Sequence, residues 1–198
     1  MKSSKKESLN YKVKNNFEKS ILFIKESKNY IYFISILFVL GIIIGFIFSS
    51  NLSFLDEILK GIIEKTANMN GLELTMYIFN NNVGVAFSSI LFGILLGIIP
   101  IFYCLSNGVI LGYVFSKLYS VSGISEFWRI LPHGIFELPA IIISLAVGLR
   151  LGLFFYSKNP KKEFIKRLIG AVRTLIFVVI PLLVIAAIIE GSLIAYLK

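Results

Sequence analysis

Long uncharged apolar runs alternate with shorter polar or basic stretches along this chain. Tyr30 to Phe48 is uncharged and rich in Ile, Leu and Phe. About 20 apolar residues of helix cross the hydrocarbon core of a bilayer, so this run predicts a first spanning helix. A similar run from about Thr174 to Ala195 predicts a last one, kinked at Pro181, with Glu190 near its end at the membrane interface.

The central stretch from Leu74 to Ser116 contains no charged residue. As one helix it would be about 65 Å long, roughly twice the hydrocarbon thickness. It must therefore fold back, and Pro100 is the natural break between an arm at 82–99 and an arm at 101–116. Two short crossings, or a re-entrant hairpin that enters and leaves by the same face, both satisfy this pattern.

The apolar stretch from Ile130 to Gly152 carries two ionisable residues, His133 and Glu137, one helical turn apart. Four residues of helix place both side chains on the same face. Ionisable groups at membrane depth are costly and usually line a protein interior or a water-filled cavity. With Pro132 suited to the first helical turn, the pattern predicts a spanning helix whose polar face lies at its entry end. Arg150, at the other end, is expected to extend to the lipid headgroups.

Three further stretches are amphipathic. Met1 to Lys28 carries eight lysines, with apolar residues at helical spacing, and predicts a basic helix on the membrane surface preceded by a solvated tail up to Asn10. Leu149 to Arg173 carries seven Lys and Arg and predicts a second basic surface helix. Between the first two spans, Phe54 to Lys65 predicts an amphipathic helix with Ser53 as its N-cap.

The composition fits this pattern, since 57% of the residues are hydrophobic and only 16% are charged. We therefore predict an all-α, polytopic membrane bundle of about five transmembrane helices with amphipathic interfacial helices. The net charge is +9, and the basic residues that produce it lie beside the apolar spans. Anionic lipid headgroups are therefore expected partners, and nucleic acid is not. Cys104 is the single cysteine and His133 the single histidine, so we expect no disulfide within the chain, no metal and no cofactor.

Small and polar residues recur within the spans. Glycines four residues apart allow neighbouring helices to approach closely, and we predict that all of these pairs pack against other helices. The pairs are Gly41 with Gly45, Gly93 with Gly97, Gly108 with Gly112, and Gly148 with Gly152. An unpaired amide inside a membrane costs free energy, so the asparagines in the spans need partners. We predict a polar intramembrane motif of Asn81, Asn82, Asn107, His133 and Glu137.

The distribution of positive residues predicts the topology. Both basic zones should be cytoplasmic, whereas the links at 49–77 and 117–129 hold two positive residues each and should lie outside. Five crossings with the N-terminus inside and the C-terminus outside satisfy this count. The chain then divides into a basic cytoplasmic segment at 1–29 and a transmembrane domain at 30–198.

These residues resemble the stage II sporulation protein M family. The resemblance runs from Tyr30 to the end of the chain, and its most specific part is the Leu-Pro-His-Gly-Ile-Phe-Glu-Leu-Pro motif that begins at Leu131. Gly108, Pro132, Gly134 and Pro139 support that motif. The pattern His-Gly-x-x-Glu-Leu-Pro is similar to the sequences of the broad archaeal and bacterial branch of the family. The resemblance implies a multi-span scaffold, as in the sporulating members, which gather peptidoglycan-degrading partners at the septal membrane.

Three functional classes fit the sequence. The first is a non-enzymatic scaffold that organises other membrane or envelope proteins, or a second copy of itself. The second is a channel, carrier or lipid-handling protein that uses the polar face of His133 and Glu137. The third is an intramembrane hydrolase in which Glu137 activates water. Metallohydrolases need more ligands than one His and one Glu, and no serine occupies a recognisable nucleophile elbow, so the scaffold is our prediction.

Overall fold

The computed structural model describes the chain at residues 2–123 and 131–197, and side-chain surroundings at 10–123 and 134–192. The described residues are helical apart from short turns and contain no strand. Five helices are long and apolar enough to cross a membrane, which confirms the predicted fold class. The elements are α1 (Lys2–Glu26), α2 (Lys28–Ile47), η1 (Ser49–Leu52), α3 (Phe54–Thr66), α4 (Gly71–Leu91), η2 (Phe92–Ile94), α5 (Ile98–Ser122), α6 (Leu131–Gly152), η4 (Leu153–Tyr156), α7 (Pro160–Thr174), the π-helical turn η5 (Leu175–Val179) and α8 (Ile180–Leu197).

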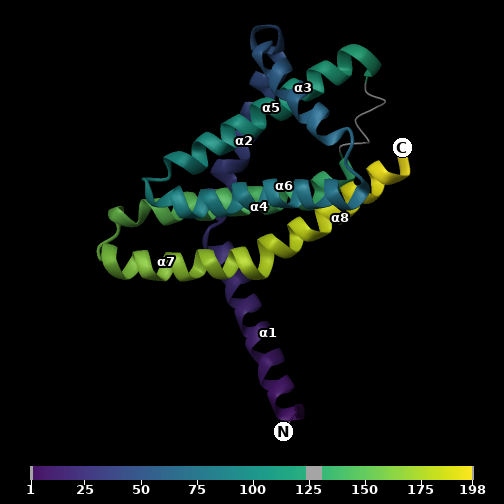
Figure 1. Cartoon of the computed structure of the whole chain (residues 1–198). Helices are drawn as coiled ribbons and strands as arrows, with labels where there is room; N and C mark the ends of the chain where they lie inside the picture. Colours follow the sequence, from purple (N-terminus) through teal and green to yellow (C-terminus); the bar gives the residue numbers. More distant parts are fainter. Residues whose placement is uncertain (1, 124–130, 198) are drawn as a thin grey trace.

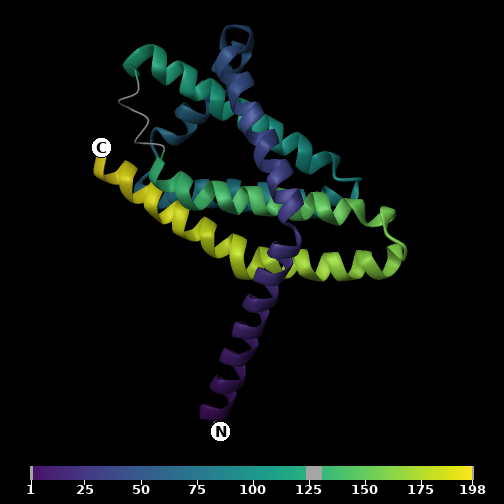
Figure 2. The same ribbon diagram turned by 180° about the vertical axis from the view of Figure 1, so that it is seen from behind.

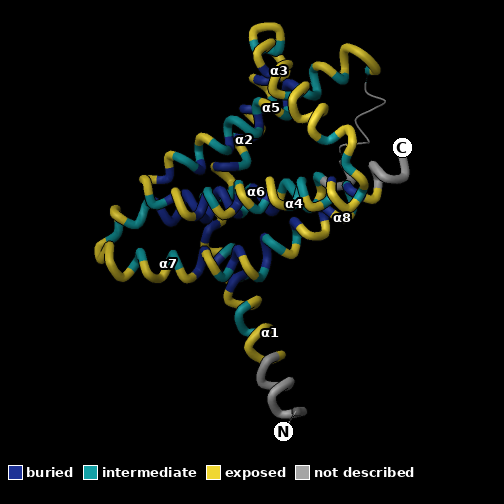
Figure 3. Tube along the Cα trace, viewed as in Figure 1, coloured by how far each residue is buried: buried dark blue, intermediate teal, exposed yellow. Residues whose placement is uncertain are grey.

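Helix α6 forms the centre of the bundle. In the membrane-span window around α6, 61% of the residues are buried, against 22–33% in the other four spans. The unbroken buried run lies in the second half of α6, at residues 144–152, and the surrounding helices have exposed outer faces (Figure 3). Because those outer faces carry large apolar side chains, the exposed surface suits hydrocarbon rather than water.

Helices α2 and α5 cross as a parallel pair with almost no space between their backbones. Gly41 lies opposite Gly108, where a Cβ added to Gly41 would lie 3.2 Å from the Gly108 Cα. Further along, Gly45 lies against Val109 and Gly112 against Ile42. Towards the start of the pair, the Cys104 thiol donates to the Ile34 carbonyl oxygen at 3.3 Å. The numbering rises together on the two helices, so both cross the membrane in the same direction.

Helices α4 and α6 form a second parallel pair built in the same way. Gly148 lies against Ser89 and Gly93, and Gly152 lies against Gly93 and Gly97. The structure therefore packs the predicted glycine pairs against one another, one set where α2 crosses α5 and the other where the turn at residues 92–97, after α4, meets the end of α6. Such contact depends on the absence of a side chain, because an added Cβ at these positions would meet backbone atoms.

The chain turns between α4 and α5 at residues 92–97, so the predicted break at Pro100 is wrong. Leu96 and Gly97 both have positive φ, 56° and 72°, which reverses the chain direction. Pro100 instead lies buried in the first turn of α5, where a proline removes no helical hydrogen bond. The two helices have 21 and 25 residues, which is long enough for full crossings.

Both basic segments are helical, and both pack against other helices of the bundle. The predicted tail up to Asn10 belongs to α1, which is helical from Lys2 and projects from the bundle at a steep angle to α7 and α8 (Figures 1 and 2). Helix α7 continues through η5 into α8, so the predicted separate surface helix is the first part of one long helix. The predicted irregularity near Pro181 takes the form of the π turn that precedes it.

At the other end of the bundle, the amphipathic helix lies where the sequence places it, as α3. Ser53 occupies the N-cap position but makes no capping hydrogen bond through its side chain, so that part of the prediction is wrong. Helix α4 instead begins with a complete capping box, in which Asn70 accepts from the backbone N–H groups of Leu72 and Glu73. This capping box fixes the beginning of α4 at Gly71.

We call the end of the bundle near Arg150 and Arg173 the basic end, and the end where α4 and α6 begin the opposite end.

Candidate functional site

A recess of about 380 Å³ separates α5 from α6. Its walls are apolar, and α2 and α4 each contribute one residue. The apolar residues that line it are Phe38, Ile110, Leu111, Val114, Phe115, Ile135, Leu138 and Ile141. Helix α5 diverges from α6 as it rises away from the turn at residues 92–97 (Figure 1), so the recess lies where the two helices separate.

Three of the predicted polar residues line this recess together: Asn82, Asn107 and Glu137. The Asn82 amide lies close enough to the Glu137 carboxyl for the two groups to interact. Asn82 is only 8% exposed, so its amide is almost fully withdrawn from the surroundings. Asn107 donates to the Tyr103 carbonyl oxygen at 2.8 Å, within its own helix. The structure thus gathers one carboxyl and two amide groups in an otherwise apolar recess.

The other predicted motif residues are placed differently. Asn81 is exposed on α4, and its side chain reaches only Asn82, at 3.4 Å. The asparagines lie in the middle of α4 rather than at the mouth of the arm, because α4 begins earlier than predicted. Gly134 lines the recess and Pro139 is exposed within α6. The side chains of His133 and Pro132 lie outside the described residues, so their role in the motif stays a prediction.

A second carboxyl group approaches the recess from α8. Glu190 is partly buried, and its carboxyl lies close enough to Glu137 for the two charges to interact. The sequence analysis placed Glu190 at the interface, whereas the antiparallel packing of α8 on α6 places it near the polar motif. Its position inside an apolar run was the available signal, since a charged residue there usually has a partner.

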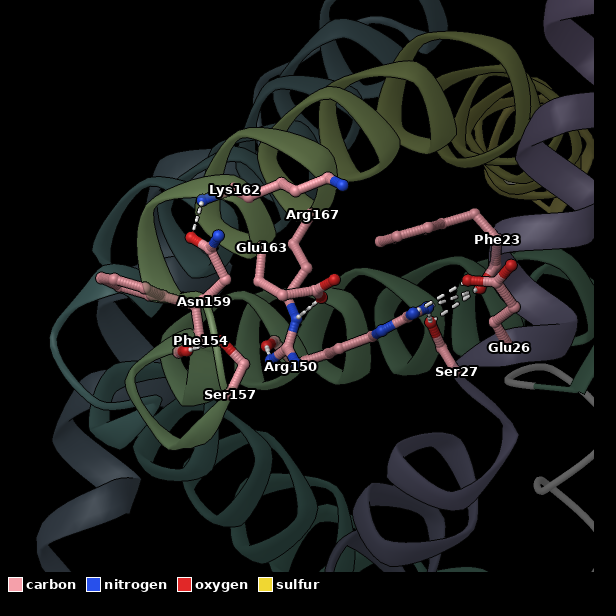
Figure 4. A network of polar contacts seen from close by, with 10 residues as sticks. All are labelled: Phe23, Glu26, Ser27, Arg150, Phe154, Ser157, Asn159, Lys162, Glu163 and Arg167. Atoms are coloured by element: carbon pink, nitrogen blue, oxygen red, sulfur yellow. Dashed lines mark hydrogen bonds and ion pairs between the residues drawn. The ribbon is translucent and has the colours of Figure 1, made fainter.

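Arg150 is a second polar centre, and it is buried rather than extended towards lipid headgroups. Its side chain is 10% exposed and lies on the end of α1 (Figure 4). The guanidinium donates to the Phe23 carbonyl oxygen at 3.1 Å, to the Ser27 hydroxyl at 2.8 Å and to the Glu26 carboxylate at 2.9 Å. It also lies 4.3 Å from the centre of the Phe23 ring. We call these residues the Arg150 clamp, and they fasten α1 to α6.

The clamp extends to α7 through a second arginine. Arg167 donates to the Arg150 carbonyl oxygen at 2.7 Å and to the Glu163 carboxylate at 3.1 Å (Figure 4). Because the hydrogen bond from Arg150 favours its charged form, the pKa of Glu26 is lowered from 4.5. The basic end of the bundle is therefore held together by charged groups from α1, α6 and α7.

The opposite end has a smaller polar cluster, which fastens α3 to α5. The Tyr113 hydroxyl donates to Asp56 at 2.6 Å, and Lys117 donates to the same carboxylate at 3.0 Å. Both bonds lower the pKa of Asp56, with the Tyr113 bond as the larger cause. Among the described residues, no group of three His, Cys, Asp or Glu could hold a metal ion. The two clusters join neighbouring helices, α1, α6 and α7 at one end and α3 and α5 at the other.

Fold and site together define a multi-pass helical membrane protein with a partly polar recess between α5 and α6. The family model for stage II sporulation protein M matches residues 34–193. The chain is also similar to the uncharacterized protein MJ0706 of Methanocaldococcus jannaschii, with 30% identity over 183 residues that cover 84% of this chain and 82% of that protein. No solved structure matches the chain. The chain belongs to the stage II sporulation protein M family, as the sequence motif predicted.

Proposed function

We propose that this chain is a non-enzymatic membrane scaffold that holds a membrane segment of a partner protein in the recess between α5 and α6. The recess itself carries the proposal. It combines apolar walls with Asn82, Asn107 and Glu137, so an apolar segment with one hydrogen-bonding side chain complements it. Polar side chains that pair across helices within a membrane stabilise association by about 1 kcal/mol each.

Rigid packing supports a scaffold rather than a carrier. Both parallel helix pairs have backbone against backbone at their glycines, at Gly112 against Ile42 and at Gly93 against Gly148. Alternating access requires one part of a bundle to rock against another. Helices in such close contact resist sliding past one another within each pair, because a shift along the helix axis brings side chains against the facing backbone. A fixed platform is the behaviour that this packing favours.

We place the basic end in the cytoplasm, so that the N-terminus is inside and the C-terminus outside. The lysines and arginines of α1 and α7 lie at this end, whereas the links beyond the other end hold few positive residues. Basic residues that flank spans are retained on the cytoplasmic side. The recess then lies towards the outer half of the membrane, where envelope partners with a single span are accessible.

A lipid-handling role is the second candidate, and the volume of the recess favours it. About 380 Å³ falls within the range of pockets that hold a small ligand, roughly 300–1,000 Å³. An acyl or prenyl chain along the apolar walls, with a polar group at Glu137, would use the same residues. The two candidates differ in what occupies the recess, a protein side chain or a lipid.

Replacement of Glu137 tests whether its carboxyl group has a structural role or takes part in proton transfer. Glu137→Gln should keep the melting temperature and the partners that co-purify with the wild-type chain, because an amide reproduces the shape and the hydrogen bonding of a protonated acid. Glu137→Leu should cost about 1–3 kcal/mol, since it removes the partner of buried Asn82. Glu64→Gln, at an exposed carboxylate whose side chain is 67% exposed, is the control and should change neither property.

Activity in cells completes the test. A scaffold predicts that Glu137→Gln functions wherever it folds and binds its partners. A Gln variant that melts normally and binds its partners but fails to complement a deletion strain would contradict the scaffold, because general-base catalysis and proton transport both require the acid itself.

A further inference from the structure

A cleft of about 520 Å³ lies where α1 crosses η5 and the start of α8. One wall comes from α1 and the other from the π turn and Pro181. Its apolar lining residues are Val13, Phe17, Ile176, Phe177 and Pro181, and its polar ones are Asn10 and Lys14. The cleft thus presents a mostly apolar interior with one positive charge.

The position of the cleft along α7 and α8 sets its depth in the membrane. The combined helical span from Pro160 covers 33 residues, which is about 50 Å of helix against a hydrocarbon core of about 30 Å. The charged first part, α7, must therefore extend out of the hydrocarbon. Arg173 is the last charged residue before the apolar part that contains Ile176 and Phe177. The cleft accordingly begins at headgroup depth and continues into the hydrocarbon.

Helix α1 is fastened to α7 at the level where the headgroups meet the hydrocarbon. Arg173 donates from Nε to the Asn16 side chain at 3.1 Å, and the Phe23 ring lies against Gly170. Beyond these contacts α1 extends away from the bundle at a steep angle to α8 (Figures 1 and 2). Val13 and Phe17 remain 48% and 47% exposed, which leaves apolar area for lipid chains to cover.

We propose that this cleft binds one anionic phospholipid of the leaflet at the basic end. Lys14 lines the cleft and contacts the phosphate, Arg173 adds positive charge from its position beside Asn16, and one acyl chain lies against Phe17 and Phe177. Charge complementarity selects the headgroup, because an anionic phosphate gains from Lys14 while a zwitterionic lipid adds its own positive charge. The inference concerns the basic end of the bundle and does not depend on the occupant of the recess.

Native mass spectrometry of the full chain, stripped of lipid and titrated with phosphatidylglycerol, tests this site. The wild-type chain should retain one phosphatidylglycerol molecule in preference to phosphatidylcholine. Lys14→Gln should weaken that binding about fivefold, the effect of one basic residue near a membrane surface. Lys12→Gln removes the same charge from the same helix, at a position that does not line the cleft, and should bind as the wild type does.

A third variant separates a cleft from a diffuse basic surface. Phe17→Ala should weaken phosphatidylglycerol binding although it changes no charge, because it removes apolar contact with the chain. Equal binding by Lys14→Gln and Lys12→Gln would overturn the proposal in favour of general attraction to lysines. Equal retention of phosphatidylcholine, or full competition by inorganic phosphate, would also overturn it, since neither result requires an anionic phospholipid.

Discussion

A single methyl group at Gly112 should disrupt the close contact between α2 and α5. A Cβ added there would lie 2.8 Å from the carbonyl carbon of Ile42 and 2.9 Å from its Cα. Ordinary contacts begin near 3.4 Å, and the obstacle is backbone, which no side-chain rotation can move. The two helices must therefore separate, and overpacking of this kind costs about 1–3 kcal/mol.

Gly84 provides a matched control for this substitution. It lies in the interior of α4, and a Cβ added there meets nothing within 4 Å. Replacement of a helical glycine by alanine gains about 0.5–1 kcal/mol of backbone entropy at either position. The helix-propensity effect thus cancels in the difference between the free energies of unfolding of Gly112→Ala and Gly84→Ala. This difference should equal the packing cost alone, about 1–3 kcal/mol.

Reversible unfolding in mixed micelles, followed by far-ultraviolet circular dichroism, measures both variants under the same conditions. We expect Gly84→Ala to be as stable as the wild type or more stable, and Gly112→Ala to be less stable. If the free energies of unfolding of the two variants agree within about 0.5 kcal/mol, the usual range for surface changes, then α2 and α5 do not pack backbone to backbone.

Two further predictions concern the clamp and the topology. Arg150→Gln should cost about 2 kcal/mol of local stability, since it removes hydrogen bonds to a charged group, and hydrogen exchange should rise in the second half of α1. Because the pKa of Glu26 is lowered from 4.5, its contribution is complete above pH 4.5 and is lost as the pH falls through the lowered value. The protection factors of α1 in the wild-type chain, which are corrected for the intrinsic pH dependence of amide exchange, should therefore fall only in acid. Single cysteines at Glu64 and Lys161, in a background without Cys104, should be labelled from opposite faces; labelling from one face would exclude five crossings.

The spans could be predicted from sequence because hydropathy and helix length depend on local composition. The first span was predicted at 30–48 and lies at Lys28–Ile47. The turn between α4 and α5 could not be located in this way. Pro100 is a strong local break signal, but a proline is tolerated in the first turn of a helix, and the reversal occurs at Leu96 and Gly97, where φ is positive.

The contacts of Arg150 could not be predicted from the sequence, for a different reason. An arginine at the end of an apolar run usually extends to the headgroups, and that is what the sequence analysis expected. Its partners Phe23, Glu26 and Ser27 are more than 120 residues away, and only the crossing of α1 over α6 and α7 brings them together. No local pattern encodes that crossing.

The polar motif was predictable in part. Asn82, Asn107 and Glu137 could be selected because each is a polar residue inside an apolar span, and the structure brings them to one recess. Asn81 follows the same rule but faces away from the recess, since its neighbour in the helix occupies the inward face. Glu190 lies near the motif because α8 packs against α6. Its level along α6 depends on which part of the long α7–α8 helix lies in the membrane, and that was not evident from the sequence.

Photocrosslinking from inside the recess tests the scaffold proposal most directly. A photoreactive phenylalanine analogue in place of Ile135, which lines the recess and is 66% exposed, should form a discrete protein adduct in native membranes. The same analogue in place of Ile188, which is 56% exposed on α8 and does not line the recess, should form lipid adducts only. Lipid adducts alone at both positions, in cells where the wild-type chain is functional, would contradict the scaffold and favour the lipid-handling role.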